Sequence, residues 1–173
     1  MNIAEVRTHF PALDQPYIFF DNPGGTQIAQ ESLDRINRYL LEYNANHGGA
    51  FPTSQKSDAI LEEARVATAH LLNASRPEEI IFGANMTTLT FNLSRALALT
   101  FQPGDKLVVT RLDHDANISP WLRVAEDRQC EVLWVDFDPA DCTVDMDSLR
   151  AALAQRPRLV AVGYASNAVG TIN

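Results

Sequence analysis

The sequence predicts an α/β fold with a mostly parallel sheet and helices on both of its faces. Short apolar runs rich in β-branched residues alternate along the chain with longer amphipathic stretches, a pattern typical of α/β proteins. The runs at 107–110, 132–135 and 159–163 are almost entirely apolar. Parallel strands that are covered by helices on both faces have this composition.

The first part of the chain, residues 1–75, is expected to hold one strand and three helices. A short helix at 3–10 precedes a strand-like run at 17–20, which stops at the turn-forming residues DNPGG. Apolar residues then recur at helical spacing over 28–43 and again over 54–72, which predicts two longer helices. A polar, glycine-rich loop joins these helices and carries His47.

The second part, residues 76–173, has the regular order of strand and helix that βαβ units require. We expect strands at 80–82, 107–110, 132–135 and 159–163, and helices at 87–99, 118–127 and 146–153. The residues after the last strand enter a loop, and no helix follows to cover that strand. An uncovered strand leaves apolar surface and a sheet edge exposed, so the chain is expected to be a fragment of a longer protein.

Composition excludes several classes of partner. Acidic residues outnumber basic ones 22 to 14, which gives a net charge of −8. This balance argues against nucleic acid or an anionic membrane surface as a partner. The N-terminus lacks the pattern of a signal peptide and no apolar run could span a membrane, so a cytoplasmic protein is expected. Cys130 and Cys142 have no metal-ligand spacing, and no metal site is predicted.

Three loops follow predicted strands, at the sheet edge where open α/β folds bind ligands. The first is 83–88, GANMTT, whose backbone N–H groups at the start of a helix would form a cradle for phosphate. The alternative is that Asn85 or Thr87 only caps the helix. The loop matches neither the Walker A pattern nor the glycine fingerprint of dinucleotide-binding folds.

The second loop, at 113–121, carries His114 between two acids, which favour the cationic form of its ring. That flat ring could stack on an aromatic ligand, although a lone histidine is more often structural. In the third loop, the amide of Asn167 could reach a polar substituent of a ligand. A turn asparagine is the alternative there.

In these loops the sequence resembles the class V aminotransferases, a family of fold-type I pyridoxal-phosphate (PLP) enzymes that includes the cysteine desulfurases. The resemblance covers nearly the whole chain. It is carried by the following segments: YIFFDN at 17–22, NHGG at 46–49, NMTT at 85–88, DHDANISPW at 113–121 and SNAVGT at 166–171.

The resemblance implies pyridoxal 5'-phosphate as cofactor, an amino acid as substrate and a homodimer as the assembly. The backbone of Met86 and Thr87, with the Thr87 hydroxyl, would hold the cofactor phosphate. His114 would be the catalytic residue that stacks on the pyridine ring, and Asn167 would bind its phenolic oxygen. His47 would face the substrate. Residues 76–173 would then be the first, incomplete part of the PLP-binding large domain.

The chain departs from the family pattern at Asn85, at Met86 and at Thr88, where glycine, a small residue and an acid are usual. Lys56 and Lys106 are its only lysines. Neither stands where the family keeps its Schiff-base lysine, so this chain is expected to be an inactive N-terminal fragment of a PLP-dependent transferase or lyase. The alternative is a catalytically silent α/β module that binds a phosphorylated ligand or a partner chain.

Overall fold

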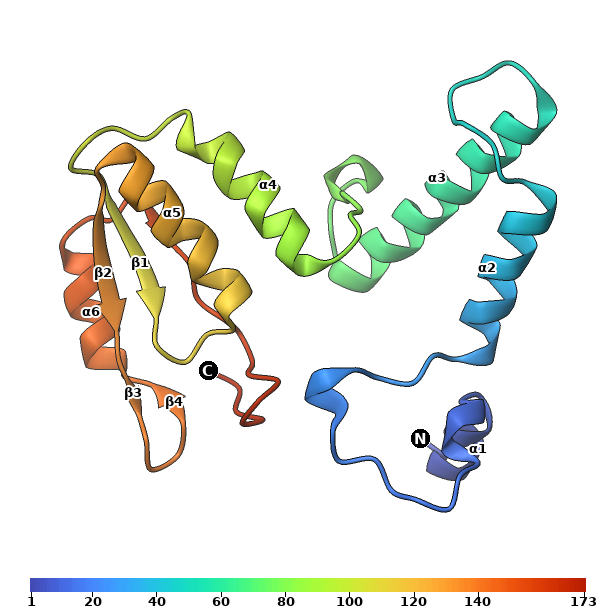
Figure 1. Ribbon diagram of the computed structural model, residues 1–173, viewed down its shortest axis with the longest axis horizontal. Coiled ribbons are helices and arrows are strands. Elements are labelled where there is room, and N and C mark those ends of the chain that lie inside the picture. Colours follow the sequence, from blue (N-terminus) through green and yellow to red (C-terminus); the bar gives the residue numbers. More distant parts are fainter. The chain divides into compact units, whose positions relative to one another are not determined.

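A computed structural model describes residues 1–173, and these divide into two units, Met1–Phe82 and Gly83–Asn173. The first unit is helical and runs from blue to green in Figure 1. The second contains all five strands together with three α-helices. None of the helices is both long enough and apolar enough to cross a membrane.

The first unit is built from three α-helices: α1 (Ile3–Thr8), α2 (Gln30–Glu42) and α3 (Pro52–Leu72). Single turns of 3-10 helix, η1 (Pro11–Leu13), η2 (Asn22–Gly24) and η3 (Pro77–Glu79), lie between and after them. Helix α3 begins with Pro52, a residue suited to the first helical turn because it has no N–H to leave unpaired. It ends at Leu72, and the left-handed backbone of the next residue, Asn73, closes the helix. The three predicted helices are confirmed.

The second unit contains a parallel three-stranded sheet with the order β2-β1-β5. Strand β1 (Lys106–Thr110) is central and pairs along its full length with β2 (Glu131–Val135). On its other side it pairs with β5 (Leu159–Val160). A small antiparallel hairpin of β3 (Phe137–Asp138) and β4 (Thr143–Val144) extends from the end of β2. The parallel sheet agrees with the α/β fold that the sequence predicts.

Helices cover both faces of this sheet, as its apolar composition predicts (Figure 1). On one face, Leu107 of β1 clusters with Val124 of α5 (Ser119–Arg128) and with Ala98 of α4 (Met86–Ala98). On the other face, Val108 clusters with Ala152 of α6 (Met146–Ala154). Successive side chains of a strand point to opposite faces, so adjacent residues of β1 enter separate cores. The short helix η4 (Asp115–Asn117) follows β1.

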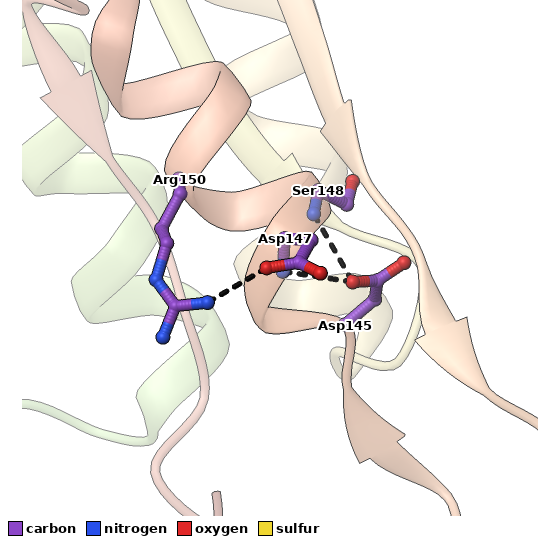
Figure 2. Close-up of polar contacts among 4 residues, drawn as sticks. All are labelled: Asp145, Asp147, Ser148 and Arg150. Carbon is purple, nitrogen blue, oxygen red and sulfur yellow. Dashed lines mark hydrogen bonds and ion pairs between the residues drawn. The ribbon is translucent and has the colours of Figure 1, made fainter.

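Helix α6 shows how local chemistry fixes where an element begins (Figure 2). The carboxylate of Asp145 accepts hydrogen bonds from the backbone N–H groups of Asp147 and Ser148, at 2.9 and 3.1 Å. Within the first turn, the Asp147 carboxylate also pairs with Arg150 at 2.7 Å. The cap satisfies donors that have no partner inside the helix, so α6 starts at Met146, as predicted.

Three predicted strands differ from the structure. Residues 17–20 and 80–82 form no strand, and β5 ends at Val160 rather than at residue 163. A strand exists only where a neighbour supplies hydrogen bonds, and no other segment of the chain pairs with 17–20 or 80–82. Ile18 and Ile81 are accordingly about four-fifths exposed, at 80% and 78%. The β3–β4 hairpin was not predicted, because two-residue strands leave no periodicity to detect.

Candidate cofactor site

A cavity of about 290 Å³ lies at the carboxyl ends of β1 and β5, within the second unit. Its walls come from the first turn of α4, from the loop between β1 and α5, and from the segment that follows β5. Ligands of open α/β folds bind at this edge of the sheet. The lining residues are Met86, Thr110, Leu112, Asp113, His114, Asn117, Val162, Gly163, Ala165, Ser166, Asn167 and Asn173.

The first turn of α4 shows which residue caps the helix and which amides the cap leaves free. The side chain of Asn85 caps the helix, because its Oδ1 accepts a hydrogen bond from the Thr88 N–H at 2.8 Å. The N–H groups of Met86 and Thr87 have no partner within the chain. Met86 lines the cavity, whereas Thr87 lies beside it on the exposed first turn and is not among the lining residues. Capping therefore leaves two amides available to an anion.

His114 stands at the start of η4, and its ring is oriented by the backbone. Nδ1 accepts a hydrogen bond from the N–H of Ala116 at 3.0 Å. The Ala116 side chain is buried, which anchors this end of the contact. An Nδ1 atom that accepts a hydrogen bond carries no proton, so the ring proton lies on Nε2.

Neither flanking acid forms a hydrogen bond or an ion pair with the ring of His114, because both carboxylates bind other partners. The Asp113 carboxylate accepts hydrogen bonds from Thr110, Asn117 and the Gly163 amide. The Asp115 carboxylate accepts one from the Ser119 hydroxyl at 2.7 Å. Adjacency in sequence placed both acids beside the histidine, but their carboxylates are hydrogen-bonded to Thr110, Asn117 and Gly163 for Asp113 and to Ser119 for Asp115.

The segment after β5 presents Asn167 to the cavity on a tight turn. The Ser166 N–H donates to the Thr171 carbonyl at 2.9 Å, and the Gly170 N–H donates to the Ser166 carbonyl at 3.0 Å. Gly170 has φ 77, a left-handed backbone that glycine adopts without strain. The side chain of Asn173 donates to the Gly163 carbonyl at 3.0 Å and holds the base of the turn.

His47 belongs to the first unit, on the loop that joins α2 to α3. Side chains of α3 hold this loop. Ser54 Oγ accepts from the Gly49 N–H at 2.7 Å and donates to the Asn46 carbonyl at 2.6 Å. The Asp58 carboxylate accepts from the Gly48 N–H at 3.1 Å. Ser54 is fully buried, whereas His47 is exposed on a loop that is fixed from within.

The structure thus brings Met86, His114 and Asn167 to one cavity, with Thr87 beside it. Sequence reasoning gave Asp113 only an effect on the charge of His114 and assigned no role to Thr110 or Asn117, although all three line the same cavity. A signal for Thr110 and Asp113 was present, because polar residues at or just beyond the carboxyl end of a buried parallel strand lie at the ligand edge of the sheet.

Neither lysine lines this cavity. Lys106 starts β1, at the end opposite to Thr110, and its Nζ donates to Gln155 at 2.8 Å. Lys56 lies on α3 with its Nζ 4.9 Å from the centre of the Tyr43 ring.

Of the two cysteines, Cys130 has a raised thiol pKa because of burial and the nearby negative charge of Asp105. No group of three or more histidine, cysteine or acidic side chains comes together to hold a metal ion.

The sequence of the chain matches a known protein family. The family model described as Aminotransferase class-V matches residues 18–173. The chain belongs to this family. The expected resemblance is thereby confirmed over nearly the whole sequence.

Relatives of this class V chain include several cysteine desulfurases. It is 41% identical over 179 residues to the aminotransferase-like protein FGM3 of Gibberella zeae, covering 99% of this chain and 43% of that protein. It is 35% identical to a cysteine desulfurase of Dickeya dadantii, again covering 99% of this chain and 43% of the relative. The chain therefore spans less than half the length of these relatives.

Solved structures show the same fold. An apo cysteine desulfurase of Thermococcus onnurineus NA1 has a TM-score of 0.87 at 28% identity, covering 98% of this chain and 42% of its own. The cysteine desulfurase CsdA of Escherichia coli has a TM-score of 0.83 at 28% identity, covering 99% and 43%. Both confirm the predicted fold, an incomplete large domain of a PLP enzyme. Class V aminotransferases and cysteine desulfurases are PLP-dependent enzymes.

Proposed function

We propose that this chain supplies the cofactor-binding part of a PLP-dependent enzyme of the cysteine-desulfurase type that acts on an amino acid. The convergence of Met86, His114 and Asn167 on one cavity at the carboxyl edge of the sheet carries the proposal. The three residues come from three loops that are far apart in the sequence. A structural role for each residue alone would not require them to meet.

The donor set of this cavity fits the chemistry of the cofactor. The unpaired amides of Met86 and Thr87 at the start of α4, with the Thr87 hydroxyl, would hold the phosphate. The His114 ring would stack on the pyridine ring, and the Asn167 amide would donate to its phenolic oxygen. When bound, the cofactor supplies an electron sink for negative charge at the α-carbon of an amino acid.

The chain's own residues would orient the cofactor and exclude water from one face. His114 carries its ring proton on Nε2, because Nδ1 accepts from Ala116. A single N–H is thus available beside the cofactor site, with a direction that the loop sets. His47 is proposed to face the substrate, from the loop that Ser54 and Asp58 hold.

We also propose that the lysine that attaches the cofactor is not in this chain, which by itself is then inactive. Lys106 lies at the far end of β1, and neither it nor Lys56 of α3 is among the residues that line the cavity. A transferase or lyase activity would belong to the longer protein, which we propose is a cytoplasmic homodimer. Exposed apolar side chains on α2 support association, since Ile36, Leu40 and Leu41 are each about half exposed or more.

Titration of the chain with PLP tests the proposal, with absorbance and tryptophan fluorescence as readouts. Pyridoxal, which lacks the phosphate, and inorganic phosphate serve as matched ligands. Binding of PLP that is clearly tighter than binding of either ligand supports a cofactor site. Equal binding of PLP and inorganic phosphate would instead favour a module for phosphorylated ligands, and no binding of PLP would contradict the proposal.

Borohydride reduction followed by peptide mass spectrometry tests the part that concerns the lysine. We expect no stoichiometric, site-selective adduct at Lys56 or Lys106. A dedicated adduct at either residue would show that the chain contains its own attachment site.

A further inference from the structure

The carboxylate of Asp113 joins three separate segments at the rim of the cavity. Its Oδ2 accepts hydrogen bonds from the Thr110 hydroxyl at 3.0 Å and from the Gly163 N–H at 2.8 Å. Its Oδ1 accepts one from the Asn117 side-chain amide at 3.3 Å. Thr110 ends β1, Asn117 ends η4, and Gly163 follows β5. One half-buried side chain therefore connects the loop that carries His114 to the segment that carries Asn167.

Gly163 leaves room for the Asp113 carboxylate because it has no side chain. A Cβ atom at this position would lie 2.5 Å from Oδ1 of Asp113, which is closer than real Cβ atoms approach an oxygen. The φ angle of Gly163 is outside the left-handed region, so the backbone conformation does not demand glycine. The absence of a side chain instead permits the close approach of the carboxylate.

Asn117 and Thr110, two of the hydrogen-bond partners of Asp113, are themselves held by the buried core. Oδ1 of Asn117 accepts a hydrogen bond from the indole N–H of Trp121 at 3.4 Å, and Trp121 is buried against Val109 and Ala161. The Thr110 hydroxyl, which donates to Asp113, belongs to a residue that is 1% exposed. A buried donor that loses its acceptor is costly, which favours a single arrangement of the carboxylate.

We propose that Asp113 is a positioning residue that sets the relation between the His114 ring and the Asn167 amide. His114 directly follows Asp113, and Asn167 lies four residues beyond Gly163, so a displacement of either segment would change the geometry of the cavity. The role as positioning residue for a cofactor rests on the function proposed above. The Asp113 contacts join residues of the chain itself, and they can be tested separately.

Hydrogen exchange in the cofactor-free chain tests the contacts. In Asp113→Ala the Gly163 amide should exchange about tenfold faster or more, as expected for the loss of a hydrogen bond to a charged acceptor. Exchange of the Val109 amide in the core of β1 should change little. Asp115→Ala is the matched control, because it removes the acid on the other side of His114, whose carboxylate accepts its hydrogen bond from Ser119. Unchanged exchange at Gly163 in Asp113→Ala would overturn the proposal.

Binding of PLP tests the positioning role. Asp113→Ala should weaken binding and move the absorbance of the bound cofactor toward that of His114→Ala, whereas Asp115→Ala should match wild type in both. If Asp113→Ala does not fold, Asp113→Asn keeps the shape of the side chain, and Gly163→Ala disturbs the contact from the opposite side. If Asp113→Ala bound PLP with wild-type affinity and absorbance, the positioning role would be overturned and the cofactor site would stand. The same result in both Asp113→Asn and Gly163→Ala would overturn it equally. A wild-type chain that does not bind PLP would overturn the proposed function and, with it, this role.

Discussion

The Nδ1 atom of His114 accepts a hydrogen bond from the backbone N–H of Ala116 at 3.0 Å. This contact spans two residues and closes the start of η4. It gives an exposed side chain a defined orientation and leaves Nε2 as the ring's only N–H. The contact is also the N-cap of η4, so one hydrogen bond both closes the turn and orients the ring.

Replacement of His114 by alanine is expected to weaken retention of PLP, because it removes the face on which the cofactor ring would stack. The measurement is titration with PLP, together with the absorbance of the bound form. His70→Ala is the control, since His70 is an exposed histidine on α3 in the other unit. If His114→Ala bound PLP as wild type does, the histidine would be structural and its assignment to the site would fail.

Thr87→Ala is expected to weaken PLP binding by roughly tenfold or more, because a hydrogen bond to a charged phosphate contributes about 1.5 to 3 kcal/mol. Thr87→Ser keeps the hydroxyl and should retain most of the affinity. Thr100→Ala removes a hydroxyl just beyond the far end of α4, where it donates to the Leu97 carbonyl, and should have no effect. Equal affinities for Thr87→Ala and Thr100→Ala would remove Thr87 from the phosphate site.

Val108→Ala is expected to lower the free energy of unfolding by about 2 kcal/mol, through lost burial and the cavity left behind. Val108 is fully buried between Val135, Val144 and Ala152. Val169→Ala, at a half-exposed position, should change stability by less than about 0.5 kcal/mol. Urea denaturation followed by tryptophan fluorescence measures both. Equal effects of the two substitutions would contradict the placement of Val108 in the core.

The pKa of Asp141 is lowered by hydrogen bonds that its carboxylate accepts from the Thr143 hydroxyl and then from the Thr143 N–H. A carboxyl whose pKa is lower in the folded state stabilises that state above its unfolded pKa, and the contribution is lost as the pH falls through the folded value. Thr143→Val should raise the pKa of Asp141 part of the way back, because the backbone donor remains. Thr143→Ser should leave it lowered. Carboxyl chemical shifts recorded against pH measure both variants, and equal titration curves for Val and Ser would disprove the role of the hydroxyl.

Self-association of the chain is expected at micromolar concentration, since α2 exposes Ile36, Leu40 and Leu41 on its surface. Sedimentation velocity across a concentration series measures it. Leu41→Lys, at the most exposed of the three, should shift the equilibrium toward monomer, whereas Arg38→Lys on the same helix should not. A strictly monomeric wild-type chain would contradict the expectation.

The sequence by itself determined the class of fold, the order of most elements and the family. Helical periodicity over 54–72 and the apolar runs at 107–110 and 132–135 reflect local burial, which the sequence records residue by residue. The motifs around Asn85, His114 and Asn167 pointed to the three loops that line the cavity. Each of these signals lies within a few consecutive residues.

Only the tertiary structure decided which apolar runs are strands and which groups the carboxylates beside His114 bind. Residues 80–82 have the composition of a strand but pair with no neighbour, while residues 159–160 pair with β1. Asp113 adjoins His114 in the sequence, yet its carboxylate binds the amide of Gly163, fifty positions away. Strand pairing and hydrogen bonds between loops depend on which distant segments the fold brings together. The sequence records the properties of each segment but not which other segment lies beside it.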